Sequence, residues 1–370
     1  MKRILHVLYT INRGGAETWL MHVLRNIDRE QFHFDFLVHT DQPGDYEEEI
    51  LQLGSSLLRV PHPSQLLIYG REARRLLREH GPYDVLHVHC PMSVGYLFHI
   101  AAQERISCRI LHAHNQRGYG RGSFSARFYK FLTSPWTARY LTHGLACSPA
   151  AATAFFGPKW SEDPRYRILP CGLDFSPFHA DVGRESIRAE LGIPPGSPVL
   201  GHVGRFEPVK NHAYLLRVTK VLLAAMPDIH LVLVGDGPLR QSTEQLAAEL
   251  GLDGHVTFTG LRDDVPRIMK GAFDVLLLPS LHEGLGLVLL EAQAAGIPCL
   301  CSDGVPREAS VVPGLMSWLP LAQSPESWAD KLAELLKTAE PIQPANALEM
   351  IEQSPYGIRR NIEELTSVYS

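Results

Sequence analysis

The sequence predicts an α/β protein made of two Rossmann-like, doubly wound parallel-sheet domains that face each other across a cleft. Short runs rich in valine, isoleucine and leucine alternate with longer amphipathic stretches, which is typical of β-α-β units. Several of the runs are almost continuously apolar, as expected for strands covered on both faces. Two such series occur, roughly at 1–170 and 198–320, and a chain of 370 residues is long enough for two or three domains.

Each predicted strand is a short apolar run, and each predicted helix has apolar residues at helical spacing. The strands are Ile4–Leu8, Phe34–Val38, Val85–Val88, Arg109–His112, Gly144–Cys147, Val199–Val203, His230–Val234, Val256–Thr259, Val275–Leu278 and Cys299–Cys301. The helices are Thr18–Asn26, Tyr69–His80, Tyr214–Met226, Leu239–Leu250, Leu287–Ala295 and a terminal one at Tyr356–Tyr369. A polar, proline-containing stretch between 170 and 198 marks the boundary, so we expect domains at 1–174 and 175–355.

Composition and charge exclude several classes of protein. With 45% hydrophobic residues the chain can bury a core, which excludes a disordered protein or a collagen. A net charge of −5 gives no general case for nucleic-acid binding. Six cysteines without a C-x-x-C pair indicate reduced thiols rather than a zinc ribbon. No apolar run is long enough to span a membrane, and the first residues are interpreted as a strand, not a signal peptide, so we expect a cytoplasmic protein.

Gly14 and Gly15 follow the first predicted strand, at the edge where ligands bind open parallel sheets. Glycines let a backbone approach a ligand closely, and the start of the following helix favours an anion. The pattern is not G-x-G-x-x-G, so it gives little support to dinucleotide binding. A tight turn with no ligand is an equally good interpretation of this pair alone.

Arg205 and Lys210 follow the strand Val199–Val203 and are candidate ligands of a diphosphate. A guanidinium offers a planar fork and an ammonium a mobile point charge, and the two can converge on one group. Taken alone, this loop can also be a solvated turn that happens to carry two cations.

Glu283 and Glu291 follow the strand Val275–Leu278, the first in a glycine-rich loop and the second in a strongly apolar helix. Gly286 and the amides of Leu287 and Val288 can cradle a phosphate at the start of that helix. A carboxylate deeper in the helix can bind the vicinal hydroxyls of a ribose. The alternative is a pair of surface glutamates, which the apolar surroundings of Glu291 disfavour.

Taken together, these motifs resemble those of the retaining GT-B glycosyltransferases, the large "family four" group. The motifs in the second half are Gly204-Arg205-Phe206 with Lys210-Asn211, Leu233-Val234-Gly235-Asp236-Gly237-Pro238, and Glu283-x7-Glu291 within EGLGLVLLEAQAAGIPC. Those in the first half are Gly14-Gly15-Ala16-Glu17, Asp84-Val85-Leu86-His87-Val88-His89 and His112-Ala113-His114-Asn115, which are similar to the capsule and exopolysaccharide branch. The resemblance covers about residues 1–315.

The resemblance implies a GT-B fold with an N-terminal acceptor-binding domain, a C-terminal nucleotide-sugar-binding domain, and a terminal helix over 356–370 that packs back on the first domain. It also implies residue roles. Arg205 and Lys210 would hold the diphosphate, Glu283 the sugar hydroxyls, Glu291 the ribose, Arg262 the nucleobase and Gly15 the phosphate, with His114 near the transferred sugar and His89 and Asn115 on the acceptor side. His112 is the weaker alternative to His114, because His114 lies nearer the C-terminal end of the strand.

The implied reaction moves a sugar from a nucleotide-diphosphate sugar, with a UDP-sugar preferred, to a glycan or lipid-linked acceptor during surface polysaccharide or glycoconjugate synthesis. Arginine, lysine and amide dipoles would stabilise the departing diphosphate, so neither a metal nor a cofactor is expected. The histidines at 87, 89, 112 and 114 could also converge on zinc, but packing or an acceptor-side role is favoured for His89.

A basic and aromatic segment, Arg117–Arg139, suggests contact with an anionic membrane surface. Eight lysines and arginines and no acidic residue lie between Arg105 and Ser161. Such a surface could bind lipid headgroups and attach the protein to the inner face of the plasma membrane. A solvated helix with inward-facing aromatic residues is the alternative.

Two other functions are compatible with such a fold. One is a GT-B sugar-nucleotide epimerase, which needs additional carboxylates in the cleft, or a phosphorylase, which needs a lysine for pyridoxal phosphate; the sequence shows no clear candidate for either. The other is a non-catalytic sugar-nucleotide-binding subunit, although every motif residue is present.

Overall fold

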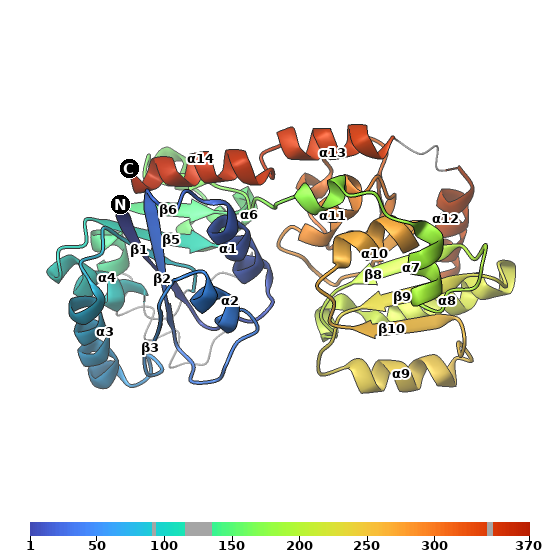
Figure 1. Ribbon diagram of the computed structural model, residues 1–370, viewed down its shortest axis with the longest axis horizontal. Coiled ribbons are helices and arrows are strands. Elements are labelled where there is room, and N and C mark those ends of the chain that lie inside the picture. Colours follow the sequence, from blue (N-terminus) through green and yellow to red (C-terminus); the bar gives the residue numbers. More distant parts are fainter. Residues whose placement is uncertain (91–93, 115–134, 339–342) are drawn as a thin grey trace. The chain divides into compact units, whose positions relative to one another are not determined.

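The computed structural model describes residues 1–90, 94–114, 135–338 and 343–370. These residues form two compact units. The first comprises Met1–Leu173 and Pro355–Ser370, and the second Asp174–Ser354. Each contains one parallel sheet and the helices around it (Figure 1).

The first unit has a seven-stranded parallel sheet in the order β3-β2-β1-β4-β5-β6-β7. Its strands are β1 Lys2–Leu8, β2 Phe32–Val38, β3 Leu57–Arg59, β4 Val85–Val88, β5 Cys108–Ala113, β6 His143–Ala146 and β7 Tyr166–Ile168. Its helices include α1 Gly15–Asn26, α2 Glu47–Gln52, α3 Leu66–His80, α4 Val94–Gln103, α6 Pro149–Phe156 and α14 Ile358–Tyr369.

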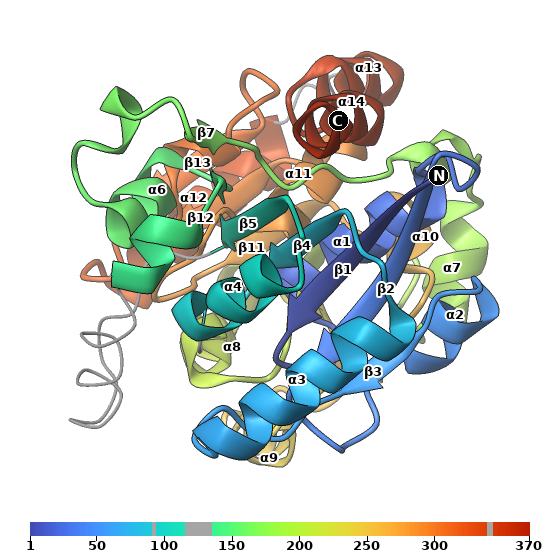
Figure 2. The ribbon, with the colours of Figure 1, turned by 90° about the vertical axis from the view of Figure 1, so that its left-hand side faces the viewer.

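Side chains alternate between the two faces of this first sheet. Leu5, Val7, Leu86, Val88 and Leu111 pack on one face with the apolar sides of α3 and α4. The opposite face carries histidines from β1, β4 and β5 and is covered by α1 and α14, which contact each other (Figures 1 and 2). Burial of apolar side chains on one face and of imidazoles on the other is the main asymmetry of this unit.

The terminal helix α14 is an integral part of the first unit. Asn361 accepts a hydrogen bond from the indole Nε1 of Trp19 at 2.7 Å and donates one to the carbonyl oxygen of Pro170 at 2.5 Å. At the end of α14, the ammonium of Lys2 donates to the carbonyl oxygen of Tyr369 at 2.8 Å. These contacts bring the two ends of the chain together.

The second unit repeats the arrangement with a six-stranded parallel sheet in the order β10-β9-β8-β11-β12-β13. Its strands are β8 Val199–Val203, β9 His230–Val234, β10 Val256–Gly260, β11 Val275–Leu278, β12 Cys299–Ser302 and β13 Met316–Leu319. Its helices are α7 Arg184–Glu190, α8 His212–Ala225, α9 Arg240–Glu249, α10 Val265–Ala272, α11 Leu287–Ala294, α12 Pro325–Thr338 and α13 Pro344–Gln353.

All ten predicted strands are present, with small shifts at their ends. Three strands were not predicted, namely β3, β7 and β13. Each has three or four residues, lies at a sheet edge and mixes apolar with polar side chains. Within the described ranges, no helix combines the length and the apolar character needed to cross a membrane.

Candidate functional site

The strand order of the second sheet locates a ligand site. The chain runs outward from β8 in one direction to β9 and β10, and in the other to β11, β12 and β13. At such a switch point the loops after the two central strands diverge and leave a crevice at the C-terminal edge of the sheet. The loops concerned are 204–211, after β8, and 279–286, after β11.

A lysine and a glutamate join these two loops. The Nζ atom of Lys210 lies 2.8 Å from Oε1 of Glu283, and both side chains are largely buried, with 19% and 12% of their surface exposed. Backbone contacts hold the same loops, since the amide of Leu281 donates to the carbonyl oxygen of Val209 at 2.8 Å. Asn211 adds a side-chain hydrogen bond to the carbonyl oxygen of Pro279 at 3.2 Å. The ion pair therefore has a fixed position at the switch point.

Two histidines pack beside Lys210. The ring of His202 contacts that of His212, with 4.8 Å between centroids, and Nδ1 of His202 donates to the carbonyl oxygen of Leu277 at 2.9 Å. Burial lowers the pKa of both histidines, that of His212 to about 4; the neighbouring His212 is the next cause for His202, and the charge of Lys210 is the next cause for His212. Both rings are therefore neutral at pH 7, which leaves Lys210 as the cation at this point. Neither histidine was predicted, because a histidine in a strand or at the start of a helix carries no distinctive signal in the sequence.

Arg205 is at the same loop but in a more exposed position. Its Nε lies 2.8 Å from Oε1 of Glu207, and about half of the Arg205 side chain is exposed. An ion pair between exposed side chains contributes little free energy, so the guanidinium can exchange Glu207 for another anion at small cost.

Two glycines explain how this loop is shaped. A side chain on Gly235 would collide with the carbonyl oxygen of Gly204, and one on Gly237 would lie 2.8 Å from the backbone of Phe206. The amide of Phe206 donates to the carbonyl oxygen of Asp236 at 2.9 Å. The Gly235-Asp236-Gly237 segment thus presses directly on the loop that carries Arg205.

Glu291 and the start of α11 complete the site within the second unit. Gly286 adopts a left-handed conformation, with φ of 82°, at the position that precedes α11. Glu291 keeps some exposed surface, but loss of hydration around its carboxyl group raises its pKa to about 7. No hydrogen bond or ion pair from this carboxyl group to another described residue is present. A buried, unpaired carboxyl group of this kind is typical of functional sites.

Arg262 forms ion pairs with residues other than those of the Lys210–Glu283 site. Its guanidinium contacts Asp264 at 2.7 Å and Glu190 at 2.8 Å, and Arg267 bonds to the same two carboxylates. Arg262 holds the pKa of Asp264 down, to about 2. Asp264 precedes α10, but its side chain makes no capping hydrogen bond within the described residues, because Arg262 and Arg267 bond to its oxygens. The nucleobase role of Arg262 stays a prediction.

In the first unit, Gly15 begins α1 and is exposed. The carboxyl group of Glu17 folds back toward the Cα of Gly14, and burial raises its pKa. The N-terminus of α1 therefore already has an acidic group beside it. His89 and His114 lie at the C-terminal ends of β4 and β5, with 2.9 Å between His89 Nδ1 and His114 Nε2. Asn115 lies outside the described residues.

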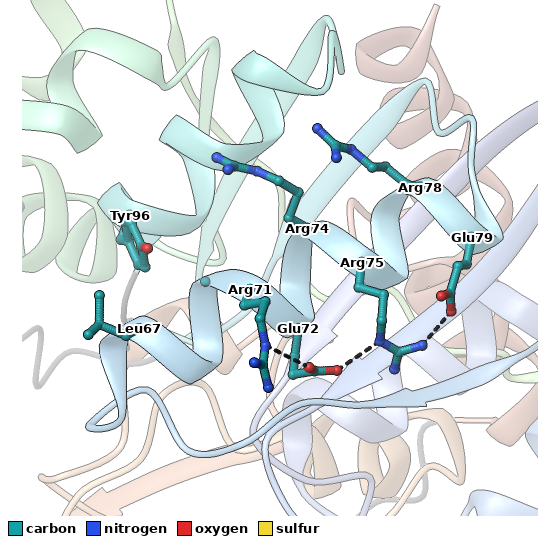
Figure 3. A pocket seen from close by; sticks show the side chains of 9 residues that line it. Leu67, Arg71, Glu72, Arg74, Arg75, Arg78, Glu79 and Tyr96 are labelled. Atoms are coloured by element: carbon teal, nitrogen blue, oxygen red, sulfur yellow. Dashed lines mark hydrogen bonds and ion pairs between the residues drawn. The ribbon is translucent and has the colours of Figure 1, made fainter.

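A surface pocket lies along α3, apart from the residues above. It is lined by Leu67, Gly70, Tyr96 and the charged side chains of α3, as Figure 3 shows. Arg75 joins Glu72 and Glu79, and Arg71 contacts Glu72 at 3.4 Å. None of the predicted site residues lines it.

Both halves of the chain match known protein families. Residues 13–176 match the family described as "Glycosyltransferase Family 4", and residues 183–351 match "Glycosyl transferases group 1". A putative glycosyltransferase, EpsF of Bacillus subtilis (strain 168), is 34% identical over 372 residues, which cover 100% of this chain and 96% of EpsF. The Escherichia coli UDP-Gal:alpha-D-GlcNAc-diphosphoundecaprenol alpha-1,3-galactosyltransferase is 31% identical over 60% of this chain and 58% of its own length.

Solved structures share the fold over the whole chain. The crystal structure of Anabaena Alr3699/HepE in complex with UDP and glucose has a TM-score of 0.80 at 18% sequence identity, covering 99% of both chains. WaaG, a glycosyltransferase involved in lipopolysaccharide biosynthesis, has a TM-score of 0.72 at 19% identity, again covering 99% of each chain. At these identities the likeness concerns the fold.

Proposed function

This chain belongs to the glycosyltransferases of group 1 and family 4 and has their GT-B fold, and we propose that it transfers a sugar, with retention of anomeric configuration, from a UDP-sugar to a glycan or lipid-linked acceptor. The fold and the class of enzyme confirm the predictions from the sequence motifs. The proposal concerns the donor, the stereochemistry and the acceptor.

The observation that carries the proposal is the Lys210–Glu283 pair at the switch point of the second sheet. The ammonium group is fixed where a ligand of an open parallel sheet binds. Arg205 lies in the same loop as Lys210 and forms an exposed ion pair with Glu207, so it can provide a second cation for the diphosphate. Glu291 offers a carboxyl group without a protein partner among the described residues, which suits the two hydroxyls of a ribose.

In the proposed reaction, the bond between the anomeric carbon and the diphosphate oxygen breaks, and its electron pair stays on the diphosphate. Lys210 and the amides of Leu287 and Val288 stabilise that negative charge from fixed positions, and Arg205 joins them by exchanging Glu207 for the diphosphate. The acceptor hydroxyl forms the new bond from the face that the diphosphate leaves, and a phosphate oxygen takes its proton. Glu283 orients the sugar hydroxyls; Gly15 is the proposed contact of the phosphate and His114 that of the sugar.

UDP is favoured as the nucleotide because Alr3699/HepE is solved with UDP and UDP-glucose and the E. coli relative is named for UDP-galactose. The name of that relative also includes a diphosphoundecaprenol acceptor. We therefore propose a lipid-linked or glycan acceptor, and a role in surface polysaccharide or glycoconjugate synthesis. Arg262 is the proposed contact of the nucleobase. His89 and Asn115 are proposed for the acceptor side.

The test is an assay with a panel of UDP- and GDP-sugars and diphosphoprenol-linked acceptors. Released nucleotide measures turnover, mass spectrometry identifies the product, and NMR of the new linkage gives its anomeric configuration. Lys210→Ala and Glu291→Ala should each lower kcat/KM at least about 100-fold, which corresponds to about 2.7 kcal/mol of lost stabilisation. Lys220→Ala, an exposed lysine of α8, is the matched control and should keep wild-type activity. Inverted product, or full activity of both site variants, would refute the mechanism.

We also propose that the first unit attaches peripherally to the anionic inner face of the plasma membrane. Most of the basic segment Arg117–Arg139 lies outside the described residues, but Trp136 and Arg139 are described. Trp136 is 39% exposed and packs on Tyr96, which also lines the pocket along α3. Next to it, α3 begins with the exposed side chains Leu66, Leu67 and Ile68, followed by four arginines and two glutamates. Apolar side chains beside arginines suit a membrane interface.

A further inference from the structure

One face of the first sheet carries a continuous set of imidazoles, of which His6, His87 and His112 are buried and His89 and His114 are half-buried. His6 of β1, His87 and His89 at β4, and His112 and His114 at β5 lie on three neighbouring strands. The rings are in contact, with centroids 5.2 Å apart between His6 and His89 and again between His89 and His114. Trp19 of α1 packs against four of these rings. Asp35, which is paired with Arg3, acts on the set only through its charge, which opposes the lowering of the His6 pKa by burial.

Three of these histidines form a hydrogen-bonded chain that ends at a thiol. Nδ1 of His6 lies 2.9 Å from Nε2 of His89, and Nδ1 of His89 lies 2.9 Å from Nε2 of His114. Nδ1 of His114 then lies 3.6 Å from Sγ of Cys171. Both ring nitrogens of His89 and of His114 are therefore engaged within the protein.

The chain constrains where the protons lie. Burial lowers the pKa of all three imidazoles far below 7, so each ring carries a single proton. In a hydrogen bond between two neutral imidazoles, one nitrogen donates and the other accepts. The three rings therefore share one tautomer: all carry the proton on Nδ1, or all carry it on Nε2.

The His6 end favours the Nδ1 form. Nε2 of His6 is buried and has no hydrogen-bond partner among the described residues. In the Nε2 form this atom would be a buried N–H group with nothing to accept its proton, whereas in the Nδ1 form it is only an unused lone pair. Unpaired buried N–H groups are rarer in proteins than under-satisfied acceptors.

The Cys171 end is compatible with the same direction. Contact with Cys147, together with burial, raises the pKa of Cys171, so its thiol keeps its proton at neutral pH. A protonated thiol still has lone pairs on sulfur, so Cys171 can accept a hydrogen bond from His114 Nδ1. The orientation is therefore selected at the His6 end and can be completed at the thiol.

We propose that His6, His89 and Cys171 are positioning residues that hold His114 in the Nδ1–H tautomer, with both of its ring nitrogens occupied. His114 then has no ring proton to exchange with a substrate and meets the sugar through the shape of its ring and its backbone. This consequence for catalysis rests on the proposed function, but the tautomer does not.

His112 provides an internal contrast. Its Nε2 lies 3.4 Å from the carbonyl oxygen of Leu169, which can only accept, so this ring carries its proton on Nε2. Its Nδ1 is buried without a partner. His112, in β5, and His114, directly after it, are thus expected to have opposite tautomers although a single residue separates them.

The test is two-bond ¹H–¹⁵N NMR of the protein with ¹⁵N-labelled histidine at neutral pH, with signals assigned through single His→Asn variants. Nδ1–H patterns for His6, His89 and His114, with Nε2–H for His112, are expected. An Nε2–H pattern or an imidazolium at His114 would overturn the proposal. One equivalent of ZnCl₂ should leave these signals in place; stoichiometric metal binding by the rings would overturn it as well.

Substitutions at the thiol end test the direction. Cys171→Ala removes the acceptor of the His114 proton, so the single Nδ1–H pattern of His89 and His114 should give way to a mixture. Cys171→Ser restores an acceptor and should restore the pattern. Cys108→Ala, a cysteine at the other end of β5 that contacts His143, is the control and should change nothing. An unchanged pattern in Cys171→Ala would refute the assigned direction. If that variant does not fold, Cys171→Ser and the wild-type signals decide.

Activity separates this inference from the proposed function. Correct tautomers in a protein that releases no nucleotide from any sugar donor would leave the inference standing and remove the proposed function. Active transfer with an Nε2–H or charged His114 would do the opposite.

Discussion

At the scale of single residues, Glu291 shows most clearly how a site residue can lower the stability of the folded protein. Burial raises the pKa of its carboxyl group to about 7 from the usual value near 4.5. Ionising it at neutral pH means charging a group that has lost most of its hydration. A residue selected only for folding would be leucine or glutamine here.

Glu291→Gln should stabilise the protein at high pH while it weakens donor binding. Because the folded protein holds this proton more tightly than the unfolded chain, wild-type stability falls as pH rises from about 4.5 to 7 and stays reduced above. Removing the charge should therefore raise the free energy of unfolding by on the order of 2 kcal/mol at pH 8, and by almost nothing near pH 4.

Urea unfolding at several pH values measures this difference. Glu249→Gln, at an exposed position of α9, is the control and should leave the unfolding free energy within about 0.5 kcal/mol at every pH. If the free energy of unfolding of Glu291→Gln differs from that of the wild type by the same amount at pH 8 and at pH 5, the carboxyl group is well hydrated and this prediction is wrong.

At the scale of elements, the loop after β9 shapes the loop after β8. Gly235 has φ of 135° and lies directly on the carbonyl group of Gly204. The glycines quoted as a motif from the sequence are therefore packing positions, and they act on Arg205 through the backbone. This relationship joins two segments thirty residues apart.

Gly235→Ala should lower both stability and activity. The new methyl group has to displace the backbone of Gly204, since a carbonyl group cannot rotate away as a flexible side chain would. We expect a loss of about 2 kcal/mol or more in the free energy of unfolding, and at least about a 10-fold fall in kcat/KM. Gly254→Ala, where φ is 78° and nothing lies within 4 Å, should cost only about 1 kcal/mol and leave activity unchanged. If Gly235→Ala and Gly254→Ala lower stability equally, the cost comes from the positive φ angle and not from contact with Gly204.

The exposed start of α3 should determine membrane attachment. Leu67 is 88% exposed and Arg71 and Arg74 follow on the same helix. Leu67→Glu combined with Arg71→Glu should abolish flotation with vesicles that contain 30% anionic lipid, a composition on the order of natural anionic membranes. Glu334→Lys on α12 changes an exposed charge of the second unit and serves as the control. Flotation that persists in the α3 variant, or is insensitive to salt, would exclude this surface.

At the scale of the whole molecule, the end of the chain stabilises the beginning. Asn361 on α14 is 1% exposed and satisfies both the indole N–H of Trp19 and the carbonyl oxygen of Pro170. A truncated side chain at this point leaves two buried polar groups without partners, one of them on α1.

Asn361→Ala should therefore destabilise the first unit by about 2–4 kcal/mol. Denaturant unfolding followed through tryptophan fluorescence measures this, because Trp19 itself is affected. Arg360→Ala, next to it on an exposed face where Arg360 pairs with Glu364, should change stability by less than about 0.5 kcal/mol. A near-neutral Asn361→Ala would mean that α14 is not needed to hold Trp19.

The strands that could be predicted from the sequence are those in which most residues are apolar and buried. Long apolar runs such as β1, β8 and β9 are buried on both faces, so a single polar residue within them does not hide the strand pattern. The edge strand β3 and the short β7 have few residues and mixed exposure, so no pattern distinguishes them from loops. Lys210 and Glu283 are 73 positions apart in the sequence. Only the family motif suggested that both belong to one site, and their ion pair was not predicted.

The sequence by itself determined two α/β units, their strands, the glycosyltransferase family and the charged residues at the strand ends, because hydrophobic period and short motifs are local properties. Only the tertiary structure decided which of these residues touch. It brought Lys210 to Glu283, took Arg262 into an ion pair network with Glu190, and stacked five histidines from three strands on one face. Side-chain contacts and proton positions depend on neighbours distant in the chain, which local patterns cannot specify.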